Sequence, residues 1–140
     1  MNRPVDTLLG VRVLLVDDDD DTRDVFGFAL RGAGADVHTA RDAKDAMVTI
    51  RQWVPSIVVS DLAMPRTDGF TLLREIHALY PFHEVAAIAV SGLDVPNLRE
   101  AVFAAGFQMH VTKPLNPEKL VALVRELAHR REVSTSEKGP

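Results

Sequence analysis

Four places in the chain carry side chains that together could bind a cation and a phosphoryl group. Asp17 and Asp18 begin a run of five consecutive aspartates, and Asp61, Ser91 and Lys113 follow farther along. Oxygen ligands without cysteine or clustered histidine favour a hard cation, Mg²⁺ before Zn²⁺. A carboxylate beside such a cation, flanked by a hydroxyl and an ammonium group, could accept a phosphoryl group whose charge its neighbours share. The product that such a site implies is an aspartyl phosphate.

Short apolar runs precede these residues and indicate how they could meet. The runs cover 11–16, 35–39, 56–60, 85–90 and 108–112. Three of them are nearly continuous Val, Ile, Leu and Ala, as expected of parallel strands covered on both faces. The second and fifth runs are more polar and fit the edges of a sheet.

The segments between the runs have apolar residues at helical spacing. Asn116 before Pro117 is typical of a helix start, and Gly34 and Gly106 stand where helix-ending glycines belong. Strand and helix alternate along the whole chain, which predicts an α/β fold with a doubly wound, five-stranded parallel sheet. The predicted helices cover 22–31, 43–50, 70–80, 98–105 and 120–127.

The polar residues fall at the carboxyl ends of predicted strands, where open α/β sheets bind their ligands. Each has an ordinary explanation when taken alone. An aspartate run is usually a solvated stretch, Asp61 could cap a later helix, Ser91 could belong to a turn, and Lys113 could be a surface lysine. All four places lie at the same end of successive strands, and this coincidence favours one cation site.

Composition and charge limit the classes of function. The 140 residues include 16 Lys and Arg against 20 Asp and Glu, so a net charge of −4 gives no field for collecting nucleic acid or anionic membrane. The absence of cysteine excludes a disulfide scaffold, thiolate zinc and a cysteine nucleophile. No membrane span or signal peptide is evident. We therefore expect a cytoplasmic domain over 11–130, a lead-in at 1–10 and a disordered tail at 131–140.

Several short motifs, taken together, resemble the receiver domain of bacterial two-component response regulators. They are Val-Asp-Asp at 16–18, Ser-Asp-Leu-Ala-Met-Pro at 60–65, Asp-Gly at 68–69, Ser-Gly at 91–92 and Lys-Pro at 113–114. The resemblance covers about residues 11–128. It implies a flavodoxin-like (βα)5 fold with strand order 2-1-3-4-5. It also implies a cis bond between Lys113 and Pro114.

The resemblance assigns roles to the residues at the strand ends. Asp61 is the expected phosphoacceptor, assisted by Lys113 and Ser91. Asp17, Asp18 and Asp61, with the backbone carbonyl of Ala63, are the expected ligands of Mg²⁺, with Mn²⁺ as an alternative cation.

The resemblance further implies a switch and a control on the lifetime of the phosphoryl group. Ser91 is expected to move toward the phosphoryl group while His110, which stands where such receivers carry Tyr or Phe, turns inward. A surface His110 without coupling is the alternative. Ala63 and Leu93 flank the expected approach of the hydrolytic water, and both are apolar, so we expect slow self-dephosphorylation. The alternative is that Asp94 or one of the aspartates at 19–21 orients that water.

A receiver of this kind takes a phosphoryl group from a sensor or hybrid histidine kinase, or from a phosphotransfer protein. It then changes the face formed by its fourth helix, fifth strand and fifth helix to control a partner protein, with a phosphorylation-dependent homodimer as a further option. Such a chain is no enzyme in the usual sense, because it catalyses only its own phosphorylation and slow dephosphorylation. A direct nucleic-acid or membrane partner is not expected. The alternative is a non-catalytic pseudo-receiver that serves as a docking module.

Other uses of these residues fail on spacing. A calcium-binding EF-hand loop that began at Asp17 would need Gly at Thr22 and Glu at Phe28. A haloacid-dehalogenase-type phosphatase would need a second aspartate where Ala63 stands. A nucleotide switch would need a glycine-rich phosphate loop, and neither common motif occurs.

Overall fold

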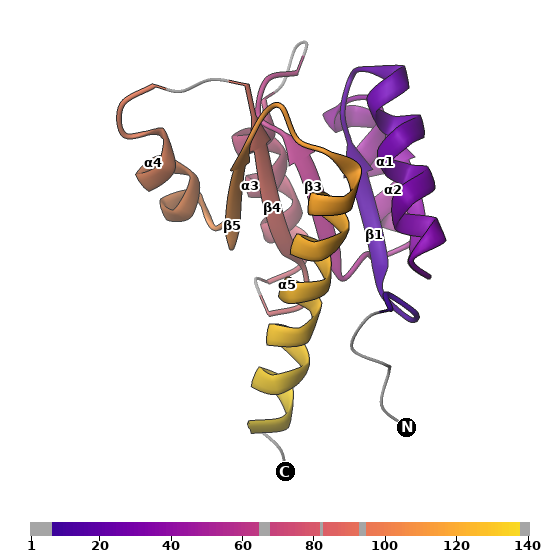
Figure 1. The fold of residues 1–140 in the computed structure, drawn as a ribbon. Coiled ribbons are helices and arrows are strands. Elements are labelled where there is room, and N and C mark those ends of the chain that lie inside the picture. The colour runs from indigo at the N-terminus through magenta and orange to yellow at the C-terminus, as the bar shows by residue number, and fades with distance from the viewer. Residues whose placement is uncertain (1–6, 65–67, 82, 93–94, 138–140) are drawn as a thin grey trace.

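A computed structural model of the chain describes residues 7–64, 68–81, 83–92 and 95–137, with side chains as far as Glu132. One sheet of parallel strands runs through the molecule (Figure 1). Its strand order, β2-β1-β3-β4-β5, confirms the predicted topology. Each strand begins and ends within one residue of a predicted apolar run. The strands are β1 (Arg12–Val16), β2 (Asp36–Ala40), β3 (Ile57–Asp61), β4 (Ala86–Ser91) and β5 (Met109–Thr112).

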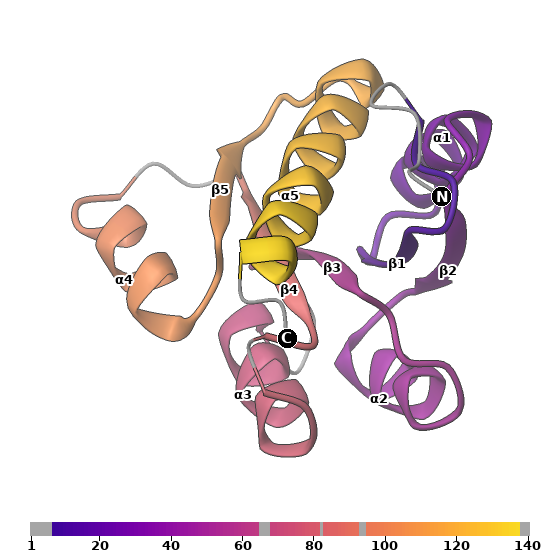
Figure 2. The ribbon, with the colours of Figure 1, turned by 90° about the horizontal axis from the view of Figure 1, so that it is seen from below.

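Helices cover both faces of the sheet. Seen from below, α1 and α5 lie on one face, while α2 and α3 lie on the other (Figure 2). The fourth helix joins the face of α2 and α3, because its buried Val102 packs in the same apolar cluster as their core residues. The helices are α1 (Asp20–Gly32), α2 (Ala43–Gln52), α3 (Gly69–Leu79), α4 (Leu98–Ala105) and α5 (Pro117–Glu137).

The continuous apolar character of the central strands follows from this layering. Successive residues of a strand point to opposite faces of a sheet. In β1, Val13 and Leu15 pack in the cluster beneath α1 and α5, whereas Leu14 and Val16 pack in the cluster beneath the other helices. Both faces of β1 are therefore buried over residues 13–16, which accounts for its continuous apolar sequence there.

Side-chain caps set the starts of four helices. The carboxylates of Asp19, Asp42 and Asp68 accept hydrogen bonds from the backbone N–H groups three residues later, at 2.9, 2.8 and 2.8 Å. Asn116 Oδ1 does the same for the N–H of Lys119 at 2.7 Å, as its place before a proline predicted. The fourth helix differs, because its N-cap residue Asn97 has φ 66° and forms no side-chain cap hydrogen bond.

Residues near both ends of the chain contact the rest of the fold. Leu8, in the expected lead-in, is fully buried, and Thr7 Oγ1 donates a hydrogen bond to the carbonyl of Ala33 at 3.0 Å. The last helix continues through Glu137 into the expected tail, and Arg131 donates hydrogen bonds to the carbonyls of His83 and Glu84 at 3.0 and 2.9 Å. Among the described residues, none of the helices combines the length and apolar character needed to cross a membrane.

Candidate functional site

The carboxyl ends of four strands gather the residues that the sequence singled out. Asp17 follows β1, Asp61 ends β3, Ser91 ends β4, and Lys113 follows β5. The strands are parallel and in close register, with Val16 beside Ser60 and Ser91 beside Thr112. All four side chains therefore belong to one rim of the sheet.

Three carboxylates of this rim converge. Asp17, Asp18 and Asp61 each offer one oxygen atom within 4.8 Å of the others, with Asp17 and Asp61 buried and Asp18 exposed. Burial raises the pKa of Asp17, and the like charges of Asp61 and Asp18 raise it further, against the opposing effects of a backbone N–H and Lys113. Such a set of close oxygen ligands fits a hard divalent cation, which would relieve the repulsion among the carboxylates.

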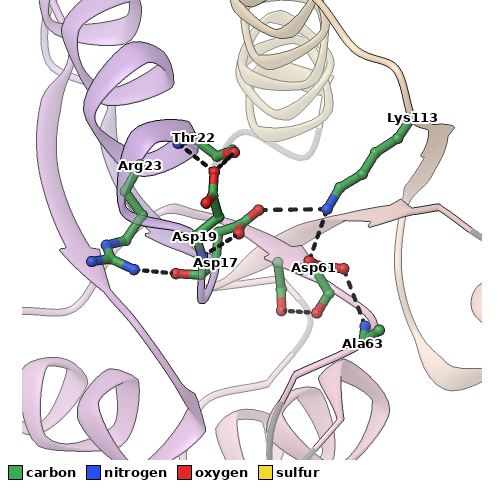
Figure 3. Close-up of polar contacts among 8 residues, drawn as sticks. Asp17, Asp19, Thr22, Arg23, Asp61, Ala63 and Lys113 are labelled. Carbon is green, nitrogen blue, oxygen red and sulfur yellow. Dashed lines mark hydrogen bonds and ion pairs between the residues drawn. The ribbon is translucent and has the colours of Figure 1, made fainter.

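Lys113 supplies the positive charge of the rim. Its Nζ lies 2.9 Å from Asp61 Oδ2 and 3.9 Å from Asp17 Oδ2 (Figure 3). Burial acts to lower the pKa of Lys113, but the hydrogen bond and charge of Asp61, together with the charge of Asp17, raise it on balance. Lys113 is therefore held as a cation. The bond between Lys113 and Pro114 is cis, as the resemblance implied.

Hydrogen bonds fix the orientation of both buried carboxylates. Asp17 Oδ1 accepts from the N–H of Asp19 at 2.9 Å, and Asp61 Oδ1 accepts from the N–H of Ala63 at 3.1 Å (Figure 3). Since Asp61 Oδ2 accepts from Lys113, each oxygen of Asp61 has a different partner. The sequence analysis missed Arg23, whose Nη1 donates to the backbone carbonyl of Asp17 at 2.6 Å. The sequence feature that could have indicated this contact is the position of Arg23, one turn into the helix that begins within the aspartate run.

Close packing beneath Asp61 explains the glycine of the Asp-Gly motif at 68–69. A Cβ atom on Gly69 would lie 2.7 Å from the backbone carbonyl oxygen of Asp61 and 3.1 Å from the Cα of Leu62. Real Cβ atoms do not approach backbone this closely, so a larger residue would displace the strand end that carries Asp61. Gly69 therefore supports the rim by leaving room for the end of β3, although it has no side chain that could take part in the chemistry.

Ser91 and His110 are already in contact. Ser91 is buried, and its Oγ lies 2.9 Å from Nε2 of the half-buried His110 imidazole. Burial lowers the pKa of His110, and the positive charge of Arg99 in α4 lowers it further. Ala63 is exposed at the rim, where its carbonyl and side chain were expected to act. The expectations for Leu93 and Asp94 lie outside the described residues.

Comparisons with known proteins support one family. The response regulator receiver domain family matches residues 13–125. An uncharacterized 14.6 kDa protein from the sodA1 3′ region of Leptolyngbya boryana is 38% identical over 120 residues, which cover 86% of this chain and 92% of that protein. The probable transcriptional regulatory protein TcrX of Mycobacterium tuberculosis is 31% identical over 129 residues, 92% of this chain. The matched part is 54% of TcrX, so the chain spans about half of that relative.

Solved structures agree with the sequence comparisons. The crystal structure of a CheY-like receiver domain protein from Methanospirillum hungatei JF-1 is similar with a TM-score of 0.82 and 26% identity, over 89% of this chain and 98% of that one. The family match covers most of the strands and helices that build the rim. The chain therefore belongs to the receiver domain family of two-component response regulators.

Proposed function

We propose that Asp61 accepts a phosphoryl group, in a Mg²⁺-dependent reaction, from a sensor or hybrid histidine kinase or from a phosphotransfer protein. The observation that carries this proposal is the buried Asp61 carboxylate. One of its oxygens lies 2.9 Å from the Lys113 ammonium group, and oxygens of two further carboxylates lie within 4.8 Å of an Asp61 oxygen. A carboxylate in this position can act as a nucleophile toward the phosphorus of a phosphodonor. The neighbouring ammonium group and a bound cation would offset the negative charge of the phosphoryl group.

The reaction transfers the phosphoryl group from nitrogen to oxygen. A carboxylate oxygen of Asp61 attacks phosphorus, the P–N bond of the donor phosphohistidine breaks, and the leaving imidazole keeps the bonding electron pair. Lys113, already hydrogen-bonded to Asp61, shares the charge of the transferred group. Asp17, Asp18, Asp61 and the carbonyl of Ala63 would hold Mg²⁺, which supplies charge neutralisation when bound.

The output surface that we propose is the face of α4, β5 and α5. The hydroxyl of Ser91 connects this face to the rim, because its partner His110 belongs to β5. His110 is in turn close enough to Arg99 of α4 for the charge of Arg99 to lower its pKa. The same helix carries Phe103, 39% exposed, with the guanidinium of Arg99 5.0 Å from its ring centre. These exposed residues suit a protein partner or a second phosphorylated copy, in a bacterial cytoplasm.

Intact-mass measurement tests the phosphoacceptor directly. The protein is incubated with Mg²⁺ and acetyl phosphate, and a mass gain of one phosphoryl group is expected. The gain should vanish with chelator and in Asp61→Asn. A suitable control is Asp36→Asn, because Asp36 is an exposed aspartate at the far end of β2. Full phosphorylation of Asp61→Asn would refute the assignment, and no gain in the wild type would favour a non-catalytic docking module.

A further inference from the structure

The hydroxyl of Ser91 has one proton to donate. His110 and a phosphoryl group on Asp61 are alternative acceptors for that proton. Ser91 Oγ and His110 Nε2 lie 2.9 Å apart, and Ser91 is only 2% exposed. A hydroxyl donates one hydrogen bond, and an unprotonated imidazole nitrogen only accepts. With Nε2 unprotonated, Ser91 is the donor in this contact and His110 the acceptor.

The surroundings of His110 favour its neutral form in this state. Burial lowers the pKa of His110, and Arg99 on α4 adds electrostatic repulsion of a second positive charge. The neighbouring strand β4 faces the ring with the uncharged Ser91. Arg99 is the charged side chain that contributes to this lowering of the pKa of His110.

We propose that His110 is a proton-linked positioning residue, which gains a proton at Nε2 when Asp61 is phosphorylated and so releases the hydroxyl of Ser91 to bind the phosphoryl group. This inference rests on the proposed phosphorylation of Asp61. Protonated Nε2 donates to Ser91 Oγ, and the Ser91 O–H then donates to a phosphoryl oxygen. The only chemical change is the uptake of one proton from water by His110, and no covalent bond between heavy atoms is altered.

Two features support an energetic link between phosphorylation of Asp61 and protonation of His110. Asp61 and Ser91 end neighbouring strands that pair in register, with Asp61 beside Val90, so the hydroxyl lies one strand from the phosphoacceptor. Phosphorylation also adds negative charge at the rim, which favours a protonated imidazole nearby. The link is reciprocal: if phosphorylation raises the pKa of His110, protonation stabilises the phosphorylated form by the same factor. The advantage is complete below the pKa of the unphosphorylated state and disappears as pH rises through the raised pKa.

The imidazole nitrogens can be followed by ¹⁵N NMR during a pH titration. One sample contains Mg²⁺ alone and the other contains Mg²⁺ with excess acetyl phosphate, and intact mass gives the phosphorylated fraction at each pH. We expect the pKa of His110 to rise by about one unit on phosphorylation, equivalent to about a tenfold coupling. The exposed His129 provides an internal reference, whose nitrogen signals should not differ between the two samples at any pH.

Two variants separate the hydroxyl relay from simple attraction between charges. In Ser91→Ala, the rise in the pKa of His110 should fall to less than about half, because the relay is lost while the added charge remains. In His110→Gln, whose amide can donate at every pH, the lifetime of the phosphorylated form should lose its dependence on pH.

The outcomes are distinguishable. An unchanged pKa of His110 in protein whose mass shows full phosphorylation overturns the proton linkage and leaves the proposed function intact. A neutral ring that merely moves its proton to Nε2, seen from the nitrogen shifts, also overturns it. A rise of equal size in Ser91→Ala overturns the role of the hydroxyl. Absence of any mass gain overturns both the linkage and the proposed function.

Discussion

Lys113 Nζ donates a hydrogen bond to Asp61 Oδ2 at 2.9 Å across 52 residues of sequence, and this contact joins the outermost strand end to the centre of the rim. The ammonium group occupies one side of a carboxylate that is 4% exposed. It therefore compensates the charge of Asp61 before phosphorylation and would remain beside the transferred group afterwards.

Replacing Lys113 by methionine should slow phosphorylation. The variant loses a charge-assisted hydrogen bond of about 1.5–3 kcal/mol, which corresponds to a loss of at least about tenfold in initial rate. The measurement is the initial rate of mass gain with acetyl phosphate and Mg²⁺. Lys113→Arg preserves the charge and should retain more of the rate than the methionine variant. Equal rates for Lys113→Met and the wild type would contradict the role of the ammonium group.

Magnesium should stabilise the wild type against thermal unfolding. The carboxylates of Asp17, Asp18 and Asp61 repel one another. A cation that binds only the folded chain therefore raises the melting temperature, and the increase continues as the concentration of free cation rises above its Kd. We expect the increase to be small in Asp18→Ala, whose cation-free form should itself melt no lower than the wild type. Asp36→Ala serves as the matched control. Identical responses to Mg²⁺ in wild type and Asp18→Ala would exclude Asp18 from the cation site.

Gly69→Ala should damage both folding and phosphorylation. The new Cβ atom would lie 2.7 Å from the carbonyl oxygen of Asp61, and forced overpacking of this kind costs about 1–3 kcal/mol of unfolding free energy. Gly32→Ala is the matched control, because nothing lies within 4 Å of a Cβ atom at that position. Denaturant titration and intact mass measure the two effects. Wild-type stability in Gly69→Ala would show that the strand end yields without strain.

The phosphorylated form should decay slowly in the wild type and faster in Ala63→Asn/Leu93→Glu. A polar side chain beside the rim could hydrogen-bond the attacking water, and one such bond of about 1 kcal/mol corresponds to roughly fivefold in rate. Decay is followed by intact mass after removal of the phosphodonor, with Ala122→Asn, an exposed position on α5, as the control. Equal decay of the double variant and the wild type would disprove control by water access.

The sheet was predictable because its pattern is local. Strands such as β1 and β3 are apolar on both faces, so continuous Val, Ile and Leu revealed them. The residues at or directly after the strand ends were then expected at one rim of the sheet. The groups present there are carboxylates, a hydroxyl and an ammonium group. Their types alone favoured cation binding and acceptance of a phosphoryl group, without knowledge of their contacts.

Contacts that depend on packing were not predictable in this way. The composition of the first ten residues gave no indication that Leu8 is fully buried, since burial there depends on the neighbouring turn after α1. The composition of residues 131–140 likewise gave no indication that Arg131 donates hydrogen bonds to two carbonyl groups. The contact between Ser91 and His110 joins β4 to β5, and no sequence pattern specifies the register of these strands, so this contact was not predictable.

The fourth helix has a mechanical consequence for the output face. It has 8 residues, Val102 is its buried residue, and its N-cap Asn97 leaves the first turn without a side-chain cap. A helix with few buried apolar contacts has a low free energy of local opening. Its backbone amides should therefore exchange with solvent hydrogen sooner than those of α3, which buries Leu72, Leu73 and Ile76. A small rearrangement at Ser91 and His110 could then shift α4 at a low cost in free energy.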